Sequence, residues 1–495
     1  MSIGGLDIGT TGCKITVYSD EGKYLDKAYR EYPVSRSTST HEVKAEYIWK
    51  AVKEVIKEVS EKNPDIKGIG VTSFGETFVM LDDNNNPIFP SMLYTDPRGN
   101  VECEEIENSI GAEKIAYITG LNPHSMFSLP KIMWIKKNQQ KEYASVKHIM
   151  LMEDYIVFML TGTAQIDYSL ATRTMAFDIR SLSWSKEILE AAGVDINLLS
   201  RPVPTGTSAG CVKEILLKEL GLTKDAIIVS IGHDQIAAAI GAGVFDSDIA
   251  VDGAGTVECI TPVFDKLPDN NILFKGGYAV VPYIVPGKYV CYAFTYTGGA
   301  LVKWFVDNLA GYEKSLADEQ KKSVYEVLEQ KMEDAPTGIL VLPHFAGAAT
   351  PYMDSGSKGA IVGLTVGHTA SDLYRAMMEG VVYEMHLNME ELNKAGIEFK
   401  ILRATGGGAN SKVWMQMKAD ILNIPISSLG SSEAGTVGCV MLTAIAVGVY
   451  KNIKEASDSL VKELDFYYPR KEQHEAYMKY YKRYKELYKA VRPLV

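Results

Sequence analysis

Cysteine is scarce in this sequence, and its copies lie far apart. Six occur in 495 residues, with no CxxC pair and no close pairing with histidine: Cys13, Cys103, Cys211, Cys259, Cys291 and Cys439. This spacing argues against a structural zinc site and against a disulfide framework. The first residues, MSIGGLDIGTT, also lack the basic and apolar regions of a secretory signal. We therefore expect reduced thiols and a cytoplasmic location.

Positive charge is in deficit, and long apolar runs are missing. The 51 Lys and Arg residues are outnumbered by 62 Asp and Glu, which gives a net charge of −11. General nucleic-acid binding depends on Lys and Arg that neutralise phosphates, so this balance argues against it, although not against a local anion site. The most apolar late stretch, residues 437–450, is too short to span a bilayer. We expect neither nucleic acid nor membrane among the partners.

Two common nucleotide-binding patterns are also absent. Neither GxxxxGK[ST] nor a GxGxxG directly after a strand occurs, which argues against a P-loop and against a Rossmann site. The composition, 46% hydrophobic and 23% charged, is that of an ordinary globular protein. A chain of 495 residues is too long for one hydrophobic core, so two large domains are expected.

Strand patterns alternate with amphipathic helical patterns. The first thirty or so residues read as strands separated by turns, residues 46–62 place apolar side chains at helical spacing, and residues 66–72 return to a strand. This alternation indicates an α/β layer structure. The Tyr- and Lys-rich end, residues 471–495, predicts an amphipathic surface helix.

One strand–turn–strand pattern occurs twice. LDIGTTGCKITVYSDEG, from Leu6, resembles VDGAGTVECITPVFDK, from Val251, and each has an Asp before a turn with Gly and Thr. Such turns present backbone N–H groups to an anion. Asp7 is also a candidate ligand for hydrated Mg²⁺. A single turn of this kind is more often structural, but the repetition favours phosphate loops and two similarly built domains, with a boundary near residues 245–248.

Two further segments place polar residues or glycines at predicted helix starts. TGGGAN, residues 405–410, precedes a predicted helix over 411–422. Its glycines allow a ligand to approach the backbone, and the helix N-terminus attracts anions, although a flexible turn is the alternative. In SIGHDQIAAAIGAGV, residues 230–244, His233 and Asp234 separate a β-branched run from an Ala- and Gly-rich helix. Asp234 is therefore either a helix cap or a reactive group.

Four longer motifs carry a resemblance to a known family. They are MFSLPKIMWIKKN (126–138), PHFAGAATPYMD (343–354), GAIVGLTVGHTASDLYRAMMEG (359–380) and GGGANSKVWMQMKADILNIPI (406–426). Together with the two acidic hairpins, they resemble the FGGY carbohydrate kinases, which belong to the sugar kinase, Hsp70 and actin superfamily. Within that family, the resemblance is to the xylulokinase-like members. The resemblance extends from Asp7 to about residue 450.

The resemblance implies a fold, an activity and a role for Asp234. The fold is α/β, with two ribonuclease-H-like (actin-like ATPase) domains and a central ligand cleft: a sugar-binding domain at 1–246 and a nucleotide-binding domain at 247–495. The activity is transfer of the γ-phosphoryl group of ATP, with Mg²⁺, to a hydroxyl of a ketose such as a pentulose or hexulose, and a primary hydroxyl is expected. Asp234 would be the general base, because a carboxylate must accept the hydroxyl proton as attack proceeds. A homodimer is also implied.

The same resemblance assigns nucleotide-binding residues one by one. Those expected to meet the phosphates, ribose or adenine are Thr10, Thr11, Lys14, Gly255, Thr256, Thr297, Gly298, Gly299, Gly407, Gly408 and Asn410, with Asp7 as the metal ligand. For Lys14, a solvated strand residue is an equal alternative.

The expected sugar site departs from the family's patterns. Its candidate residues are Glu76, Thr77, Asp96, Arg98, His233 and Gln235. The xylulokinase-like QMHG pattern is absent here, and Glu76-Thr77 looks more like the glycerol kinase version, without its preceding Arg. Asp96 and Arg98 either hold the sugar or orient one another. The alternatives are a kinase for glycerol or another polyol, and a nucleotide-dependent binding protein of the actin and Hsp70 type.

Overall fold

The two acidic hairpins are both formed. The computed structural model describes residues 1–268, 271–430 and 433–495. Strands β1 (Ser2–Ile8) and β2 (Gly12–Ser19) pair antiparallel, with Asp7 opposite Lys14. Strands β16 (Ile249–Ala254) and β17 (Glu258–Phe264) pair in the same way, with Asp252 opposite Ile260. Each hairpin belongs to a different sheet.

Contacts divide the chain into two compact units. Unit 1 contains Met1–Gly243, Ala279–Tyr289 and Glu433–Val461, and unit 2 contains Val244–Tyr278, Val290–Ser432 and Lys462–Val495. The chain leaves unit 1 after Gly243 and returns to it with two later segments. The chain therefore passes between the two units more than once, and the domain bounds 1–246 and 247–495 stay a prediction.

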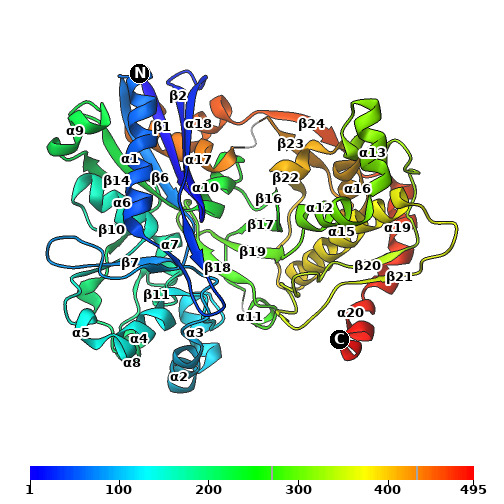
Figure 1. Ribbon diagram of the computed structural model, residues 1–495, viewed down its shortest axis with the longest axis horizontal. Coiled ribbons are helices and arrows are strands. Elements are labelled where there is room, and N and C mark those ends of the chain that lie inside the picture. The colour runs from blue at the N-terminus through cyan, green and yellow to red at the C-terminus, as the bar shows by residue number, and fades with distance from the viewer. Residues whose placement is uncertain (269–270, 431–432) are drawn as a thin grey trace. The chain divides into compact units, whose positions relative to one another are not determined.

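The sheet of unit 1 has the strand order β14-β15-β6-β1-β2-β3. Its outer and central strands, besides β1 and β2, are β3 (Tyr24–Glu31), β6 (Ile66–Ser73), β14 (Thr207–Cys211) and β15 (Ile227–His233). Helices α1 (Ala45–Lys62), α6 (Met152–Thr161) and α9 (Glu214–Leu220) supply apolar side chains to one core cluster with β1 and β2 (Figure 1). The helix predicted over 46–62 is confirmed as α1.

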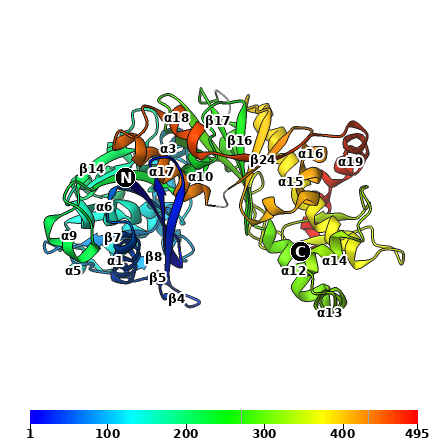
Figure 2. The same ribbon diagram turned by 90° about the horizontal axis from the view of Figure 1, so that it is seen from above.

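The opposite face of this sheet is covered by α17 (Ala434–Ala446), which packs against β1 and β6 (Figures 1 and 2). It lies beside α10 (Asp234–Gly241), the helix that follows β15. A Cβ on Gly241 would stand 1.9 Å from the Ala434 carbonyl oxygen, and one on Gly438 would stand 2.0 Å from that of Ala237. The small residues after Asp234 therefore allow two helix backbones to touch.

Smaller elements complete unit 1. The short strands form the sheets β4-β5-β8, β7-β9, β10-β13 and β11-β12. Their bounds are β4 (Val34–Arg36), β5 (His41–Val43), β7 (Phe78–Leu81), β8 (Ser91–Met92), β9 (His148–Leu151), β10 (Gln165–Asp167), β11 (Phe177–Asp178), β12 (Ser183–Trp184) and β13 (Arg201–Val203), with β18 (Ala279–Pro282) in the returning segment. The helices are α2 (Asn100–Ile110), α3 (Ala112–Thr119), α4 (Ser128–Asn138), α5 (Gln140–Tyr143), α7 (Tyr168–Thr172), α8 (Lys186–Ala192) and α18 (Ile453–Leu460).

In unit 2 the strands run in the order β19-β17-β16-β22-β23-β24. Those not yet given are β19 (Tyr289–Thr295), β22 (Ile401–Thr405), β23 (Ile426–Leu429) and β24 (Glu463–Tyr467), with a separate pair, β20 (Leu340–Leu342) and β21 (Ala360–Val362). The helices are α11 (Ile272–Lys275), α12 (Gly299–Leu309), α13 (Gly311–Gln320), α14 (Val324–Glu329), α15 (Ala370–Lys394), α16 (Lys412–Leu422), α19 (Lys471–Tyr484) and α20 (Leu487–Val491). Helices α15 and α16 pack together (Figure 2).

The C-terminal surface helix is confirmed in part. Helix α19 ends at Tyr484 and a shorter helix follows, so the segment from 471 is not one continuous helix. Tyr477, Tyr481 and Tyr484 of α19 are buried. Its tyrosines therefore form the inner face of an amphipathic helix.

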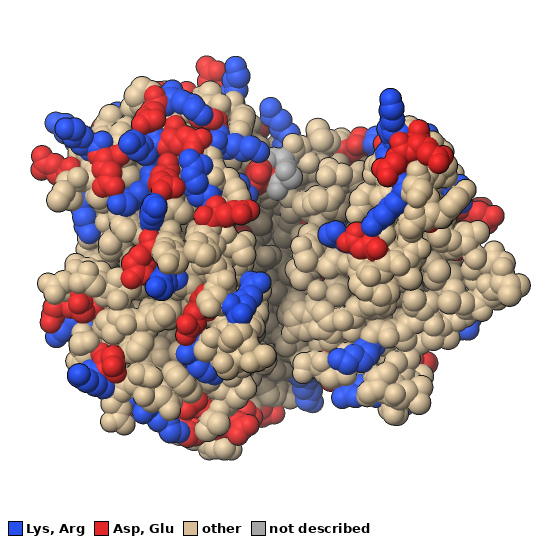
Figure 3. Space-filling view, in the orientation of Figure 1, with Lys and Arg blue, Asp and Glu red and all other residues tan. Residues whose placement is uncertain are grey.

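Several expectations from composition can be compared with the structure. All six cysteines are free thiols. Among the helices of the described chain, none combines the length and apolarity that crossing a membrane requires. Lys and Arg are interspersed with Asp and Glu on the face of unit 1 that is visible in Figure 3. That face carries no single-sign stripe of the kind that nucleic-acid binders use.

Candidate functional site

Asp234 starts a helix at the end of a central strand. It directly follows β15 and is the first residue of α10, and its side chain is 36% exposed. Partial withdrawal from water and the negative charges of Asp7 and Glu76 raise the pKa of Asp234 to about 7, against the opposing effects of a backbone N–H and Arg173. A carboxyl group with this pKa can exchange a proton near neutral pH. The helix start and the reactive role are compatible.

His233 lies against this carboxylate as a neutral ring. Its Nε2 is 3.3 Å from Asp234 Oδ1. Burial, reinforced by the Arg173 charge, lowers the pKa of His233 well below its usual value. The His233 N–H donates to Ser169 Oγ at 3.0 Å, and that hydroxyl donates to Asp167 at 2.8 Å. The start of α7 thereby fixes the end of β15.

Glu76 is paired with an arginine that the sequence did not single out. Arg173 Nε donates to Glu76 Oε1 at 2.6 Å, and its Nη2 contacts the same oxygen. The two side chains are only 8% and 5% exposed. A Cβ on Gly75 would stand 3.2 Å from Arg173 Cγ and 3.1 Å from the His233 ring. Glycine before Glu76 therefore leaves the space that Arg173 and His233 occupy.

The backbone at Glu76 is held in an uncommon conformation. Its φ of 64° lies in the left-handed region, which is costly for a residue with a side chain. The Glu76 carbonyl accepts from Ser128 Oγ at 2.6 Å, and the Phe127 ring lies 5.1 Å from the Arg173 guanidinium. The motif at 126–138, which forms α4 and its start, therefore supports the Glu76–Arg173 pair.

Tyr94 lies near the Glu76–Arg173 pair and was not among the sugar-site residues predicted from the sequence. Burial and the Glu76 charge, with a smaller effect of Asp234, raise the pKa of the Tyr94 phenol, while Arg36 acts in the opposite direction. Its ring is 41% exposed. The candidate residue Thr77, unlike Tyr94, is not exposed. Its hydroxyl is fully buried and has no hydrogen-bond partner among the described residues.

Asp96 and Arg98 orient one another. Arg98 donates to both Asp96 oxygens, from Nε at 2.8 Å and from Nη2 at 2.6 Å, and the His41 N–H donates at 2.7 Å. Burial would raise the pKa of Asp96, but these donors outweigh it and lower the pKa. Arg98 also contacts Glu42 and lies over the Trp134 ring at 5.0 Å. The Asp96 carboxylate has little hydrogen-bonding capacity left for a ligand.

The first hairpin turn keeps its threonines accessible. Thr11 is exposed and Thr10 is partly exposed, while Tyr32 donates from its hydroxyl to the Gly9 carbonyl. Lys14 Nζ lies 3.8 Å from Asp7 Oδ2 and contacts Glu433. Desolvation and the Glu433 charge raise the pKa of Asp7, which Lys14 opposes. Lys14 is therefore paired rather than simply solvated.

In unit 2, three turns hold the residues expected to bind nucleotide. Gly255 and Thr256 are exposed at the β16–β17 turn, and Gly407 and Asn410 are exposed in the glycine cluster. The Thr297 hydroxyl donates to the Pro343 carbonyl. Gly298 and Gly299 donate from their N–H groups to the Thr256 and Gly255 carbonyls, at 3.0 and 2.9 Å. Gly408 is partly exposed in the same cluster.

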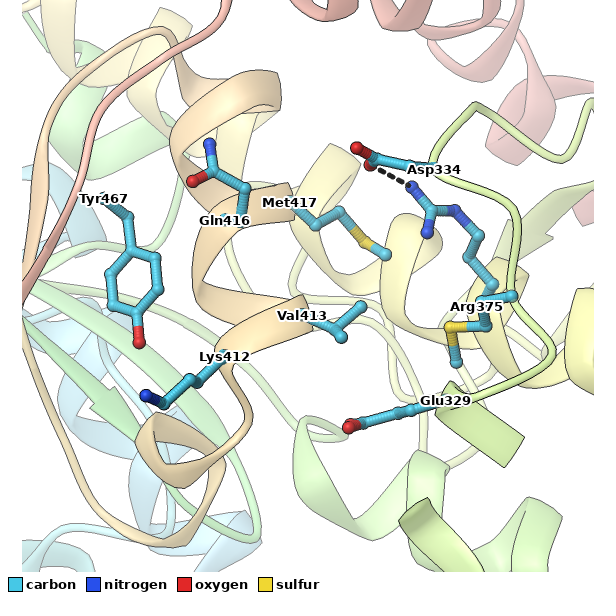
Figure 4. Close-up of a pocket in the computed structure, with 9 residues that line it drawn as sticks. Glu329, Asp334, Arg375, Lys412, Val413, Gln416, Met417 and Tyr467 are labelled. Carbon is cyan, nitrogen blue, oxygen red and sulfur yellow. Dashed lines mark ion pairs between the residues drawn. The ribbon is translucent and has the colours of Figure 1, made fainter. Parts of the chain in front are cut away.

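Helix α16 begins where the glycine cluster ends, as the sequence predicts. Ser411 caps it by accepting from the Trp414 N–H. One pocket, of about 130 Å³, includes Gly406 and Asn410. A second, of about 360 Å³, lies along the side of the helix (Figure 4). Its lining residues are Glu329, Met332, Asp334, Arg375, Lys412, Val413, Gln416, Met417 and Tyr467.

Comparison with known proteins identifies the class of this molecule. The solved xylulose kinase of Lactobacillus acidophilus, with ligand bound, superimposes with a TM-score of 0.90 at 23% identity, covering 99% of this chain and 98% of the other. This likeness confirms the two-part α/β fold of the actin-like ATPase type.

The family follows from the sequence models. The N-terminal domain model of the FGGY family of carbohydrate kinases matches residues 2–241, and the C-terminal domain model matches 255–447. The chain belongs to this family, so it is an enzyme, a carbohydrate kinase. It is 28% identical to a xylulose kinase of Staphylococcus epidermidis over 502 residues, covering 99% of this chain and 97% of the relative. It is also 28% identical to a glycerol kinase of Lactococcus lactis over 475 residues, covering 92% and 91%.

Proposed function

We propose that this kinase transfers the γ-phosphoryl group of ATP to a hydroxyl of a pentulose, with Asp234 as general base. The position and pKa of Asp234 carry this proposal. Asp234 accepts the hydroxyl proton as the oxygen attacks, while neutral His233 and the Glu76–Arg173 pair orient the sugar. Backbone N–H groups at the 9–12 and 254–257 turns bind phosphate oxygens. The names of the xylulose kinase relatives support the choice of a pentulose.

Magnesium fits the residues at the first hairpin. Mg²⁺ is commonly held by one or two carboxylates, water and substrate phosphates, and the partly exposed Asp7 carboxylate suits this. Within the described chain, no cluster of three or more ligating side chains would make a protein-only metal cage. Asp7 would hold the ion through water, and the bound ion would neutralise charge on the phosphates.

A short polyol such as glycerol is the second candidate substrate. Gly75 stands where the glycerol kinase pattern has an arginine, yet Arg173 brings a guanidinium to Glu76 from another part of the chain. Because Arg173 supplies a guanidinium beside Glu76, glycerol or another short polyol stays the second candidate substrate. The cytoplasmic location and the homodimer also stay predictions, and mass photometry of the purified protein tests the latter.

A substrate panel tests the proposed function. Purified protein with MgATP should release ADP on addition of D-xylulose or D-ribulose, with a higher kcat/KM than with D-fructose, glycerol or gluconate. Preference for glycerol would select the second candidate. If no compound stimulated ADP release, the nucleotide-dependent binding protein would be the better description.

The pH dependence of kcat/KM for the sugar tests the state of Asp234. The base acts only when ionised, so kcat/KM should be low below pH 6, rise through a midpoint near pH 7, and level off above it. The charged groups around Asp234 are Asp7, Glu76 and Arg173. Replacing Glu76 by Gln removes one negative charge, so the midpoint should move to lower pH. A flat profile from pH 5.5 to 8.5 would contradict the assignment.

A further inference from the structure

A buried ionic triad lies beneath the turns of unit 2. Lys418 of α16 places Nζ 2.6 Å from Asp252 Oδ2 and in contact with Glu258 Oε1. All three side chains are completely buried. Because Asp252 belongs to β16 and Glu258 begins β17, one ammonium group joins the helix to both strands of the hairpin.

The acids and the lysine of the triad shift one another's pKa values. Burial and the Asp252 charge raise the pKa of Glu258 well above its usual value, although Lys418 opposes this. Burial acts to lower the pKa of Lys418, but the two acids outweigh it and raise the pKa. The two acids thus favour the charged form of the Lys418 ammonium, although that group is buried. Charged groups are seldom buried unless paired in this way.

The residues around the triad touch all three turns. Lys418 Nζ lies 4.9 Å from the centre of the Trp414 ring. That ring lies 3.1 Å from the Cβ position of Gly408, and the Gly406 Cβ position is 2.6 Å from the Ala254 carbonyl oxygen. The glycine cluster therefore rests on the hairpin turn, with Trp414 and Lys418 below it.

The third turn meets the triad through Glu258. The Cβ position of Gly298 lies 2.8 Å from Glu258 Oε2, an atom with no hydrogen-bond partner among the described residues. The turn at 297–299 therefore packs directly on this carboxyl. Movement of the triad would therefore displace all three turns of unit 2 that are expected to bind nucleotide.

We infer that Lys418 is a positioning residue for the nucleotide site, which it serves by holding the turns at 254–257, 297–299 and 406–410 in one arrangement. The inference rests on the proposed role of these turns in binding ATP. Lys418 is too deeply buried to touch the nucleotide. Its contribution is preorganisation, because turns fixed in their bound arrangement lose less conformational freedom on binding.

Lys418→Met tests this inference through MgATP affinity, measured by calorimetry without sugar. We expect the Kd for MgATP to rise at least tenfold, while the KM for sugar at saturating MgATP stays within twofold. Arg470→Met is the matched control, because it removes the guanidinium from Asp420, another fully buried carboxylate of α16. The Arg470→Met substitution should lower the melting temperature and leave the Kd for MgATP within twofold of the wild-type value.

A triple variant separates positioning from charge burial. Lys418→Met with Asp252→Asn and Glu258→Gln removes every charge of the triad, so the melting temperature should recover relative to the single variant. The Kd for MgATP of the triple variant should remain at least tenfold above that of the wild type. If Lys418→Met alone does not fold, the Kd of the triple variant tests the inference in its place. Wild-type affinity in a folded Lys418→Met or in the triple variant would overturn the inference. A wild-type protein that binds no MgATP would overturn the proposed nucleotide site as well.

Discussion

Replacement of Asp234 by Asn should reduce kcat for sugar phosphorylation by about 10²- to 10⁴-fold, the usual contribution of a general base. The amide keeps the shape of the side chain and its place at the start of α10, but it cannot accept the hydroxyl proton. The Kd for MgATP should stay within twofold, because the residues expected to bind nucleotide lie in other turns. Single-turnover kinetics with calorimetry measures both quantities.

The control for this variant is Asp83→Asn, which makes the same chemical change at an exposed carboxylate. Asp83 contacts Lys147 at 3.6 Å and lies outside the candidate site. Its kcat should equal that of the wild type. Near-normal turnover in Asp234→Asn would remove the base assignment.

Replacement of Arg173 by Met should raise the KM for sugar by about 10- to 100-fold, which corresponds to one lost charge-assisted hydrogen bond of roughly 1.5–3 kcal/mol. Without Arg173, the Glu76 carboxylate is buried without its cation and no longer held toward the substrate. The variant should also be destabilised, by about 3–5 kcal/mol, as when other buried ion pairs are broken. The KM for ATP should not change.

The pH profile separates this role from a purely structural one. The Arg173 charge lowers the pKa of Asp234, so its removal should move the midpoint of kcat/KM to higher pH, opposite to the shift in Glu76→Gln. The double variant, Arg173→Met with Glu76→Gln, should regain stability without regaining sugar affinity. A folded Arg173→Met variant with wild-type KM and midpoint would show that the pair serves stability alone.

Local patterns predicted several local elements correctly. The helix at 45–62 follows from apolar spacing, and the helix at 412–422 follows from the glycines and Ser411 before it. The two hairpins could be recognised because each repeats the same turn chemistry over a few residues. Asp234 could be placed at a helix start for the same reason.

The partners of these residues could not be predicted from local patterns. Arg173 is 97 residues from Glu76, and Lys418 is 166 residues from Asp252. A short helix capped by Asp167 could have been predicted before Arg173, but nothing in the sequence says what that arginine faces. Pairing across such distances depends on how side chains from distant segments pack in the folded chain, which local patterns do not specify.

The late return of α17 to the first unit has a consequence for synthesis on the ribosome. Strands β1 and β6 emerge early, but the helix that covers one face of their sheet lies at Ala434–Ala446. At translation rates of 5–20 residues per second, that face stays uncovered for roughly 20–70 s after β6 has been made. During this interval the nascent chain exposes a sheet surface on which chaperones can act, so the early half of the chain completes its fold only when the late half has been made.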